Sequence, residues 1–343
     1  MIWPGWRTFE GSWYRLKTNT TTGSKPMAVL SQERTQPSNE PMPTISIGRF
    51  KVDRVEEFLL PGFAPDALYP TFDSSVFKEW SWLAGPSVYD PVSKNLMSSL
   101  HSWILRDGQE TIIIDTGVGN GKKRDYPGFG DRFHMVNTPY LDRLAAIGIR
   151  PSDVTQIVIT HLHMDHVGWS TINVDGRWVP TFPNARYILG REDMARVLSP
   201  EFLAKGGMAE QVAHDSILPV IHAGLVDSSE PGMELFPGFS FESAPGHTPD
   251  QLAIRVRSDG ADALFTADAF HTPIQIVRPD WSSRFALDPK AAQRTREGIL
   301  ERAASEGTIL FPSHFCDPFY GRIARHGSGY RFAGLDGRIL GSS

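Results

Sequence analysis

The chain has 343 residues, of which 40% are hydrophobic and 21% are charged, and its formal net charge is −5. This is the composition of a globular protein large enough to bury a core, and the acidic balance argues against nucleic acid or an anionic membrane as the main partner. The single cysteine, Cys316, excludes an intrachain disulfide and a cysteine-based zinc cage, so any bound metal must rest on histidine and carboxylate.

Residues 1–44 differ in character from the remainder of the chain. Trp3, Trp6 and Trp13 stand among polar residues, and the following stretch to residue 43 is rich in Thr, Ser, Pro, Gln and Asn. Such a segment is typical of a mobile leader or arm, and its tryptophans favour docking on a partner subunit in a homodimer. Packing on its own domain and an upstream start-codon artefact are the alternatives. We therefore predict a leader or dimerisation arm over residues 1–44 and one domain over residues 45–343.

Strand and helix patterns alternate from residue 45 onward. Strands are predicted over residues 46–60, 99–105, 111–114, 156–160, 186–189, 239–243, 252–256, 263–266 and 308–311. Helices are predicted from the Thr138-Pro139 start to Gly148, and over residues 191–198, 208–221 and 289–305. Alternation with hairpins predicts a layered α/β domain with mixed sheets. Neither a membrane-spanning run nor a secretory signal is recognisable, so we expect a cytoplasmic protein.

The densest chemical signal is His161-Leu162-His163-Met164-Asp165-His166, directly after an apolar strand. His161 and His163 differ by two positions, so in extended or turn backbone their side chains can point to the same side. Asp165 and His166 lie across a tight turn, toward a second position. One metal ion cannot easily use all four side chains without strain, whereas two adjacent ions can take two each.

This motif resembles the His-x-His-x-Asp-His signature of the metallo-β-lactamase superfamily, and three further elements match in order. A Gly-His-Thr-Pro sequence contains His247, a strand ends in Asp268, and a final strand ends near His314. The resemblance covers roughly residues 45–333. It implies the αβ/βα sandwich of that superfamily, in which two mixed β-sheets are flanked by helices.

The resemblance also implies a ligand set for two divalent ions, Zn²⁺ in the first place, with Mn²⁺, Fe²⁺ or Co²⁺ as alternatives. It assigns the first ion to His161, His163 and His247, the second ion to Asp165, His166 and His314, and the bridging position to Asp268. Asp115 matches a buried aspartate of the superfamily, which we interpret as a support that orients ligand imidazoles. A turn-forming role in Asp-Thr-Gly is the alternative.

Asp268 stands where true β-lactamases of the superfamily place a cysteine, so the ligand set resembles the lactonase and organophosphate hydrolase branches instead. Residues 270–273 and 278–281 look most like methyl parathion hydrolase-like and hydrolytic dehalogenase-like members. In acyl-homoserine lactonases a tyrosine stands three residues after the bridging aspartate, whereas here that residue is His271. His271 can donate a hydrogen bond to the developing oxyanion or leaving group, and a supporting or surface position is the alternative.

The expected chemistry is hydrolysis by a hydroxide that bridges two metal ions, because two cations lower the pKa of a shared water toward neutrality. The expected substrate is a small apolar ester or lactone. A hydrolytic dehalogenase of a chlorinated aromatic, or an organophosphate triester hydrolase, is the alternative. Asp165 is predicted to be catalytic as well as a ligand, because its place in the motif allows it to move a proton of the bridging solvent.

Three aromatic residues are predicted to bind substrate, because Trp169 and Phe270 follow ligands closely and Trp281 lies in the same region of the chain. Core packing is the alternative for each. The runs Lys122-Lys123-Arg124 and Arg191-Glu192-Asp193 are interpreted as solvated charges, and Cys316 as a small packing residue near the site.

Overall fold

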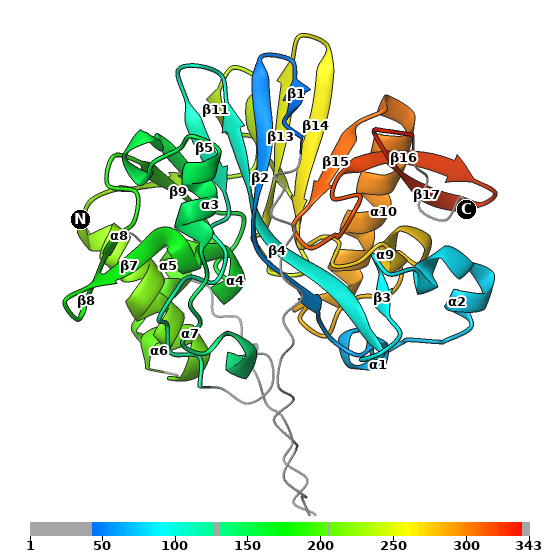
Figure 1. Ribbon diagram of the computed structural model, residues 1–343, viewed down its shortest axis with the longest axis horizontal. Helices are drawn as coiled ribbons and strands as arrows, with labels where there is room; N and C mark the ends of the chain where they lie inside the picture. The colour runs from blue at the N-terminus through cyan, green and yellow to red at the C-terminus, as the bar shows by residue number, and fades with distance from the viewer. Residues whose placement is uncertain (1–42, 126–129, 205, 338–343) are drawn as a thin grey trace, which may run out of the picture. The chain divides into compact units, whose positions relative to one another are not determined.

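Two mixed β-sheets carry the fold, and the computed structural model describes residues 43–125, 130–204 and 206–337 (Figure 1). The first sheet has the order β1-β2-β4-β5-β6-β9-β10, with β3 beside β4, and the second has the order β11-β12-β13-β14-β15-β16-β17. The strands of the first sheet are β1 (Ile45–Ile47), β2 (Phe50–Pro61), β3 (Tyr89–Asp90), β4 (Asn95–Arg106), β5 (Thr111–Ile114), β6 (Gln156–Val158), β9 (Arg186–Gly190) and β10 (Val226–Ser229). Those of the second are β11 (Glu234–Phe236), β12 (Phe239–Ser243), β13 (Leu252–Ser258), β14 (Ala261–Ala267), β15 (Ile309–Pro312), β16 (Gly321–His326) and β17 (Gly329–Gly334). A separate hairpin joins β7 (Thr171–Val174) to β8 (Arg177–Pro180).

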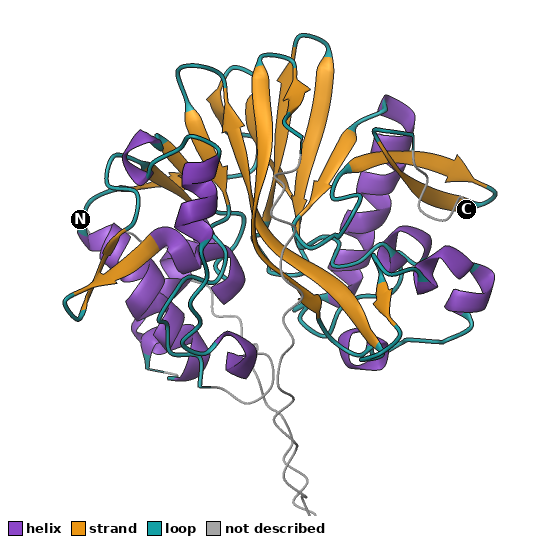
Figure 2. Cartoon of the chain, viewed as in Figure 1, coloured by secondary structure: helices purple, strands orange, loops and turns teal. Residues whose placement is uncertain are grey.

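Both sheets contain parallel and antiparallel pairs. In the first sheet β5, β6, β9 and β10 are parallel neighbours, and in the second β14 is parallel to β15. A parallel pair needs a crossover connection, and helices supply it here. The strands and their flanking helices are seen together in Figure 2. The predicted architecture of two mixed β-sheets flanked by helices is therefore confirmed.

The helices cover the outer faces of the two sheets. They are α1 (Pro65–Leu68), α2 (Val76–Glu79), α3 (Tyr140–Ala146), α4 (Met164–Val167), α5 (Arg191–Val197), α6 (Pro200–Leu203), α7 (Gly207–Val212), α8 (Leu218–His222), α9 (Ile274–Val277) and α10 (Pro289–Glu306). A π-helical turn, η5 (Ala213–Ile217), joins α7 to α8, and single 3₁₀ turns lie at η1 (Ser81–Ala84), η2 (Gly130–Phe133), η3 (Pro151–Asp153) and η4 (Gly168–Ser170). Ile299, Leu300 and Ala303 of α10 pack on the second sheet, as the apolar spacing of that helix predicts.

The core between the two sheets is apolar and rich in aromatic rings. Val52 and Trp103 of the first sheet meet Ile254, Phe265 and Phe311 of the second in one buried cluster. The Phe265 and Phe311 rings stack at 4.5 Å, and the Trp103 ring meets Phe311 edge-on at 5.0 Å. Burial of each such side chain stabilises the fold by about 1.5–3 kcal/mol. This core holds together the sheet ends that carry the candidate site.

Several predicted elements differ from the structure in their ends. The strand predicted over residues 46–60 is two strands with a turn between them, and α3 begins at Tyr140, after Pro139. Thr138 does not cap this helix, whose N-cap residue is Pro139, and the Thr138 hydroxyl instead lies within hydrogen-bond distance of Glu57 and Asn120. The hairpins β7–β8 and β16–β17 were not predicted. The leader predicted over residues 1–44 lies, except for its last two residues, outside the described residues.

The two runs interpreted as solvated charges are in part buried, so that interpretation is wrong for three residues. Lys122 and Arg124 have no exposed surface, and Asp193 is 1% exposed. Arg124 makes a two-bond ion pair with Asp215, at 2.6 and 3.0 Å, and Asp193 pairs with Arg196. A buried charge persists only when it is paired in this way.

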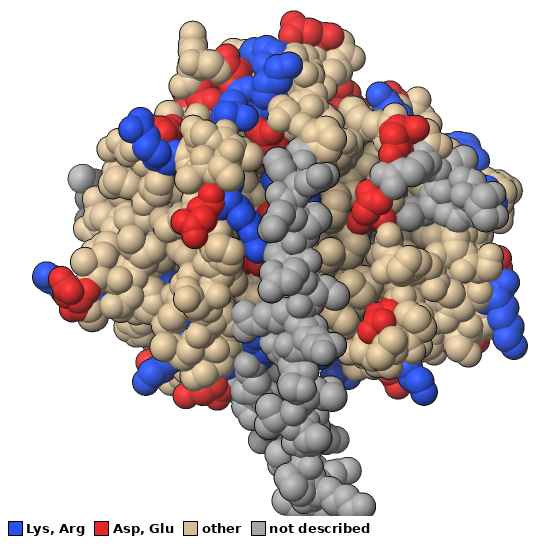
Figure 3. Space-filling model, in the orientation of Figure 1, with Lys and Arg blue, Asp and Glu red and all other residues tan. Residues whose placement is uncertain are grey.

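Charge on the surface is mixed. Acidic and basic side chains are interspersed on the described part of the face in Figure 3. Among the helices of the described ranges, none combines the length and the apolar character that crossing a lipid bilayer would require.

Candidate metal centre

The central motif is divided into two pairs of side chains by a turn in the backbone. The chain leaves β6 at Val158 and reaches His161 and His163 in irregular conformation, with His163 extended at φ −80° and ψ 158°. Helix α4 begins at Met164, so Asp165 and His166 lie in its first turn. The two pairs therefore lie on different backbone conformations, yet His161 and His166 approach each other with ring centroids 4.1 Å apart, and with Asp268 they form a further group that could hold a metal ion.

The remaining side chains of the candidate site arrive from strand ends in both sheets. Asp115 follows β5, and His161 follows the parallel neighbour β6. Asp268 follows β14 directly, and His314 lies two residues past the parallel neighbour β15. His247 lies on the connection after β12. Carboxyl ends of parallel strands share one sheet edge, which is where α/β proteins place their ligands.

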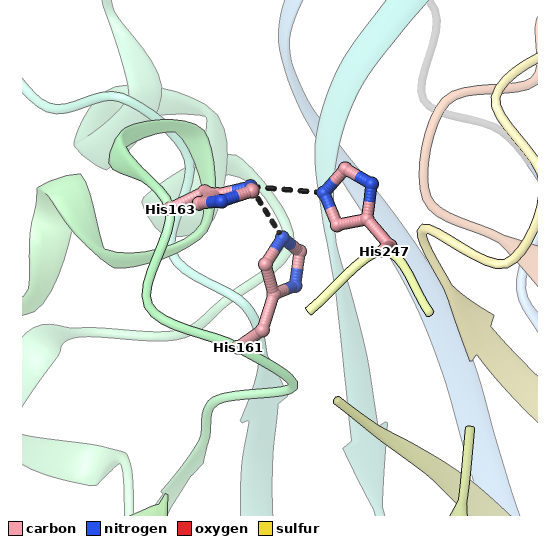
Figure 4. A group of neighbouring side chains, drawn as sticks. All are labelled: His161, His163 and His247. Carbon is pink, nitrogen blue, oxygen red and sulfur yellow. Dashed lines mark hydrogen bonds between the residues drawn. The ribbon is translucent and has the colours of Figure 1, made fainter. Parts of the chain in front are cut away.

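Three histidines form the first group. Nδ1 of His163 lies 3.0 Å from Nε2 of His161 and 2.9 Å from Nε2 of His247. Figure 4 shows the three rings turned toward one another, two from the loop before α4 and one from the connection after β12. Their ligand atoms lie close enough to hold one metal ion.

Asp165, His166 and His314 form a second group whose ligand atoms are also close enough to hold a metal ion. Nε2 of His314 lies 3.7 Å from Oδ2 of Asp165, and Nε2 of His166 lies 3.9 Å from the same oxygen. Both histidines are buried, whereas the Asp165 side chain keeps 11% of its surface exposed. Asp165 is therefore the member of this group that faces solvent.

Asp268 lies between the two groups, with one carboxylate oxygen toward each. Its Oδ2 is 3.2 Å from Nε2 of His247 and 3.9 Å from Nε2 of His161. Its Oδ1 is 3.0 Å from Nε2 of His314 and 3.3 Å from Nε2 of His166. A carboxylate that presents its two oxygens to two separate ligand groups has the arrangement of a bridging ligand.

The chemistry of the cluster fits a pair of divalent ions. Nε2 of His166 and Oδ1 of Asp268 are buried and have no hydrogen-bond partner among the described residues. A buried polar atom without a partner is costly, and a metal ion would satisfy both. Imidazole nitrogen with carboxylate oxygen is a donor set that zinc, manganese and ferrous iron accept.

Burial and the nearby carboxylates determine the charge state of the imidazoles. Burial lowers the pKa of His163 to about 4, and lowers the pKa values of His161 and His247 well below the usual value. These three rings are therefore neutral at pH 7, which is the form that ligates metals. Burial also acts to lower the pKa of His166, but the carboxylates of Asp268 and Asp115 outweigh it and raise that pKa well above the usual value.

Hydrogen bonds from outside the two groups orient their members. Asp115 accepts bonds from the Thr160 backbone N–H at 2.8 Å and the Thr160 hydroxyl at 2.9 Å, and it lies 2.8 Å from Nδ1 of His166. Nδ1 of His314 lies 3.1 Å from the carbonyl oxygen of Ser99. The sequence indicated Asp115 but not Ser99, whose contact spans 215 positions and leaves no local signal.

The backbone is strained on both sides of the site. Asp115 has φ +57° and Ala267, the residue before Asp268, has φ +49°. Non-glycine residues rarely adopt this left-handed region, and they do so mainly where the surrounding structure determines the conformation. The positions of Asp115 and Asp268 are thus imposed by the two sheets.

His271 lies at the edge of the cluster. It is 9% exposed, and its Nε2 is 3.4 Å from Oδ2 of Asp268 and 3.4 Å from the Ser283 hydroxyl. Its ring centroid is 5.0 Å from that of His247, and with Asp268 these two histidines form another group that could hold a metal ion. The structure thus brings this predicted residue beside the ligand groups.

The three aromatic residues predicted to bind substrate lie in the protein interior. Trp169 is 3% exposed, stacks on Tyr140 at 5.2 Å and donates from Nε1 to Glu57 at 2.7 Å. Phe270 is fully buried under α10, and Trp281 is 2% exposed in a separate apolar cluster. Each ring packs against other side chains in the described structure, and a role of these residues in substrate binding stays a prediction.

The chain was compared with known proteins. The metallo-β-lactamase superfamily profile matches residues 99–314. The N-acyl homoserine lactonase AiiA of Bacillus thuringiensis subsp. kurstaki is 23% identical over 239 residues, which cover 66% of this chain and 86% of the relative. The N-acyl homoserine lactonase AttM of Agrobacterium fabrum is 28% identical over 136 residues, which cover 38% of this chain and 47% of the relative.

Two solved structures show the same fold. The hydrolase AbOPH of the β-lactamase superfamily has a TM-score of 0.68 at 23% identity, covering 84% of this chain and 95% of that one. AidC, described as a dizinc quorum-quenching lactonase, has a TM-score of 0.68 at 19% identity, covering 88% of this chain and 97% of that one. The profile match spans more than half of the chain and includes the strand ends that carry the site. The chain therefore belongs to the metallo-β-lactamase superfamily and is a metal-dependent hydrolase.

Proposed function

We propose that this protein is a dinuclear hydrolase that cleaves a small apolar ester or lactone. The observation that carries the proposal is the position of Asp268, whose two carboxylate oxygens face two separate groups of ligand atoms. A site for a single metal ion would not require a carboxylate that presents one oxygen to each of two ligand groups. Hydrolysis is the reaction that two adjacent divalent ions support best with these ligands.

The ligand assignment follows the two groups. One ion is held by His161, His163 and His247, the other by Asp165, His166 and His314, and Asp268 belongs to both. Zinc is the first choice, with manganese, ferrous iron or cobalt also compatible. When bound, such a pair of ions lowers the pKa of water toward neutrality and polarises the substrate oxygen.

Asp165 is proposed to hold and move a proton as well as to serve as a ligand. Of the second group it has the most exposed side chain, at 11%, and its Oδ2 is within 4 Å of two ligand imidazoles. A carboxylate that lies beside the reacting solvent and open to the substrate side can accept its proton and return it to the leaving group.

His271 is proposed to donate a hydrogen bond to the developing oxyanion or leaving oxygen. Burial lowers its pKa to about 4, so the ring is neutral at pH 7 and carries a single N–H donor. Its Nε2 faces the cluster beside Asp268. A donor in this position would stabilise negative charge that grows on the substrate during attack.

Relatives support the ester or lactone class. AiiA and AttM are N-acyl homoserine lactonases, and AidC is described as a quorum-quenching lactonase. The dehalogenase and organophosphate alternatives rest on the resemblance of residues 270–273 and 278–281 to such members, so a chlorinated aromatic and a phosphotriester enter the test panel.

The experiment combines metal analysis of the purified chain with aryl esters, γ-lactones, an acyl-homoserine lactone, a phosphotriester and a chlorinated aromatic. We expect about two metal ions per chain and turnover of at least one ester or lactone. Asp268→Asn should abolish both metal binding and turnover. Asp262→Asn is the matched control, because Asp262 lies on β14, the strand that Asp268 follows, but pairs with Arg255 outside the cluster. Less than one metal per chain together with no hydrolysis would overturn the proposal, and turnover of the chlorinated aromatic or phosphotriester alone would favour the alternative.

We also propose a cytoplasmic homodimer that uses residues 1–44 as its arm. The molar mass of the full chain and of a chain lacking residues 1–44, both measured by light scattering, tests the oligomeric state. A monomeric mass for both would contradict the dimer.

A further inference from the structure

We propose that Glu57, a buried carboxylate of β2 that touches no ligand of the cluster, is a positioning residue for the ligand group formed by Asp165, His166 and His314. The proposal rests on the metal binding proposed above but not on the identity of the substrate. It concerns how the fold holds helix α4 in the place that its ligands require.

Glu57 is 2% exposed and accepts four hydrogen bonds from the described residues. Its Oε2 accepts the Val118 backbone N–H at 2.6 Å, and its Oε1 accepts the Gly119 backbone N–H at 3.1 Å. Its Oε1 also accepts Nε1 of Trp169 at 2.7 Å and the Thr138 hydroxyl at 3.3 Å. Every partner is a donor, so the site fits a group that accepts on both oxygens and donates nothing.

Val118, Gly119 and Trp169 belong to two segments whose backbones are hydrogen-bonded to each other. One segment is the loop after β5, residues 115–119, and the other is the end of α4 with Trp169. Thr116 N–H donates to the His166 carbonyl at 2.6 Å, and Trp169 N–H donates to the Thr116 carbonyl at 2.7 Å. Gly168 N–H donates to the Gly117 carbonyl at 2.7 Å. Glu57 therefore joins two segments that are themselves joined at the metal ligand His166.

The two segments are packed as closely as their backbones allow. A Cβ on Gly117 would lie 2.0 Å from Oε2 of Glu57, and a Cβ on Gly168 would lie 1.9 Å from the Val118 backbone carbon. The contact at Gly168 is with backbone and could be relieved only by separating the loop from the α4 segment, whereas the contact at Gly117 would displace the Glu57 carboxylate. A side chain at Gly117 or Gly168, or a loss of the hydrogen bonds to Glu57, would shift the loop of residues 115–119 relative to the α4 segment.

The shift would reach the second ligand group more directly than the first. Asp115 begins the loop and lies 2.8 Å from Nδ1 of His166, so a displaced loop moves the ring as well as the backbone of that ligand. Among the described residues, the histidine group of His161, His163 and His247 makes no backbone hydrogen bond to residues 116–119. Its link to the loop is indirect, because Asp115 accepts the Thr160 hydroxyl, which lies 3.1 Å from Nδ1 of His161. Loss of the Glu57 carboxylate is therefore expected to weaken metal binding by the group of Asp165, His166 and His314. The affinity of the histidine group should stay close to its original value.

Buried charged side chains lie around the loop that Glu57 binds. Lys122 and Arg124 lie in the same interior with the single carboxylate of Asp215, and the ammonium of Lys122 lies 3.9 Å from the ring centroid of Trp178. The Glu57 carboxylate, when ionised, acts with Asp215 to favour the charged form of Lys122, which opposes the lowering of the Lys122 pKa by burial. Burial raises the pKa of Glu57 to about 7, and the four donated bonds oppose that rise.

The experiment uses Glu57→Gln in the full-length protein, because the amide NH₂ would face N–H donors while the side-chain volume is kept. Each metal site is read separately, in a His163→Ala background that keeps the second group and in a His314→Ala background that keeps the first. Zinc dissociation constants are measured by competition with a chromophoric chelator. We expect Glu57→Gln to weaken binding by about tenfold or more in the first background and by less than about twofold in the second.

Two further variants separate positioning from loss of stability. Asp262→Asn, in a carboxylate network of the second sheet, should lower thermal stability without changing either dissociation constant. Trp169→Phe removes one of the four bonds and should weaken the second site in the same direction by a smaller factor, which tests the proposal even if Glu57→Gln does not fold.

The outcomes are distinct. The positioning role would be overturned if Glu57→Gln and Trp169→Phe each weakened zinc binding equally at both sites, or if neither variant weakened it at either site. Both results would leave the proposed metal binding intact. A wild-type chain that binds no zinc would overturn the proposed function and this inference together.

Discussion

Asp115 and His166 are bonded through a carboxylate oxygen and Nδ1 that lie 2.8 Å apart, although 51 positions separate them in the chain. The bond orients the His166 ring so that its Nε2 faces Asp268, at 3.3 Å from Oδ1. A carboxylate behind a metal-binding imidazole orients the ring and raises its basicity. The same carboxylate accepts two bonds from Thr160, the residue before His161, so one side chain supports both halves of the motif.

Asp115→Asn should lower zinc affinity and turnover by about 10- to 100-fold, because an amide cannot accept from Thr160 and from His166 with both of its terminal atoms. Asparagine tolerates the positive φ of this position, so the fold should be retained. Asp115→Ala should lose a further ~1–2 kcal/mol of unfolding free energy through backbone strain. Chelator competition and urea unfolding measure the two effects. An Asp115→Asn enzyme with unchanged zinc affinity would contradict this role.

His271→Ala should reduce kcat by about 10²- to 10³-fold, which is typical for loss of a donor to a growing negative charge. KM and metal content should change little, because His271 is not part of either main ligand group. Steady-state kinetics and metal analysis on the same preparation provide the readout. Loss of a metal ion from this variant would instead identify His271 as a ligand.

Asp215→Ala should destabilise the protein by about 3–5 kcal/mol, because it leaves Lys122 and Arg124 buried without a carboxylate partner. Asp227→Ala is the matched control, since its ion pair with Arg186 is exposed on both sides and should contribute no more than about 1 kcal/mol. Urea unfolding of both variants measures the difference. Similar losses for the two variants would show that the buried cluster is not a stability determinant.

Stability should depend on pH through Glu57. Burial raises its pKa from 4.5 to about 7, so the folded chain binds more protons than the unfolded chain between these values. The contribution of Glu57 to the free energy of unfolding should therefore fall as the pH rises from 4.5 to 7, by at most about 3 kcal/mol. The difference between wild type and Glu57→Gln, measured by urea unfolding in chelator across this range, isolates the effect. A difference that is independent of pH would contradict it.

Cys316 should be almost unreactive in the folded protein. It is 5% exposed, and burial raises the pKa of its thiol to about 12, so at pH 8 the reactive thiolate is about a thousandfold scarcer than for an ordinary cysteine. Reaction with an aromatic disulfide reagent should be slow in buffer and should reach one thiol per chain in denaturant. Rapid labelling of the native protein would show that the site opens around this residue.

Much of the candidate site could be predicted because its signals are local. His161, His163, Asp165 and His166 stand within six residues, across the change from extended backbone to α4, so their spacing alone places them close together. Asp268 and His314 each follow a short apolar strand, so a sheet edge could be expected to collect them. The same local patterns located helix α10 and most strands, although not the hairpins β7–β8 and β16–β17.

The amino-acid sequence by itself indicated the strand ends that carry the site and the α/β class with mixed sheets, because these depend on patterns within a few residues. The candidate ligand set came from the resemblance to the metallo-β-lactamase superfamily. Only the tertiary structure decided which aromatic rings and charges are buried. Trp169 follows a candidate ligand closely, yet its indole N–H donates to Glu57, 112 positions away. Lys122 and Arg124 form ion pairs with Asp215, which is also distant in the chain. Burial and pairing depend on contacts between segments far apart in the chain, and such contacts leave no periodic pattern in either segment.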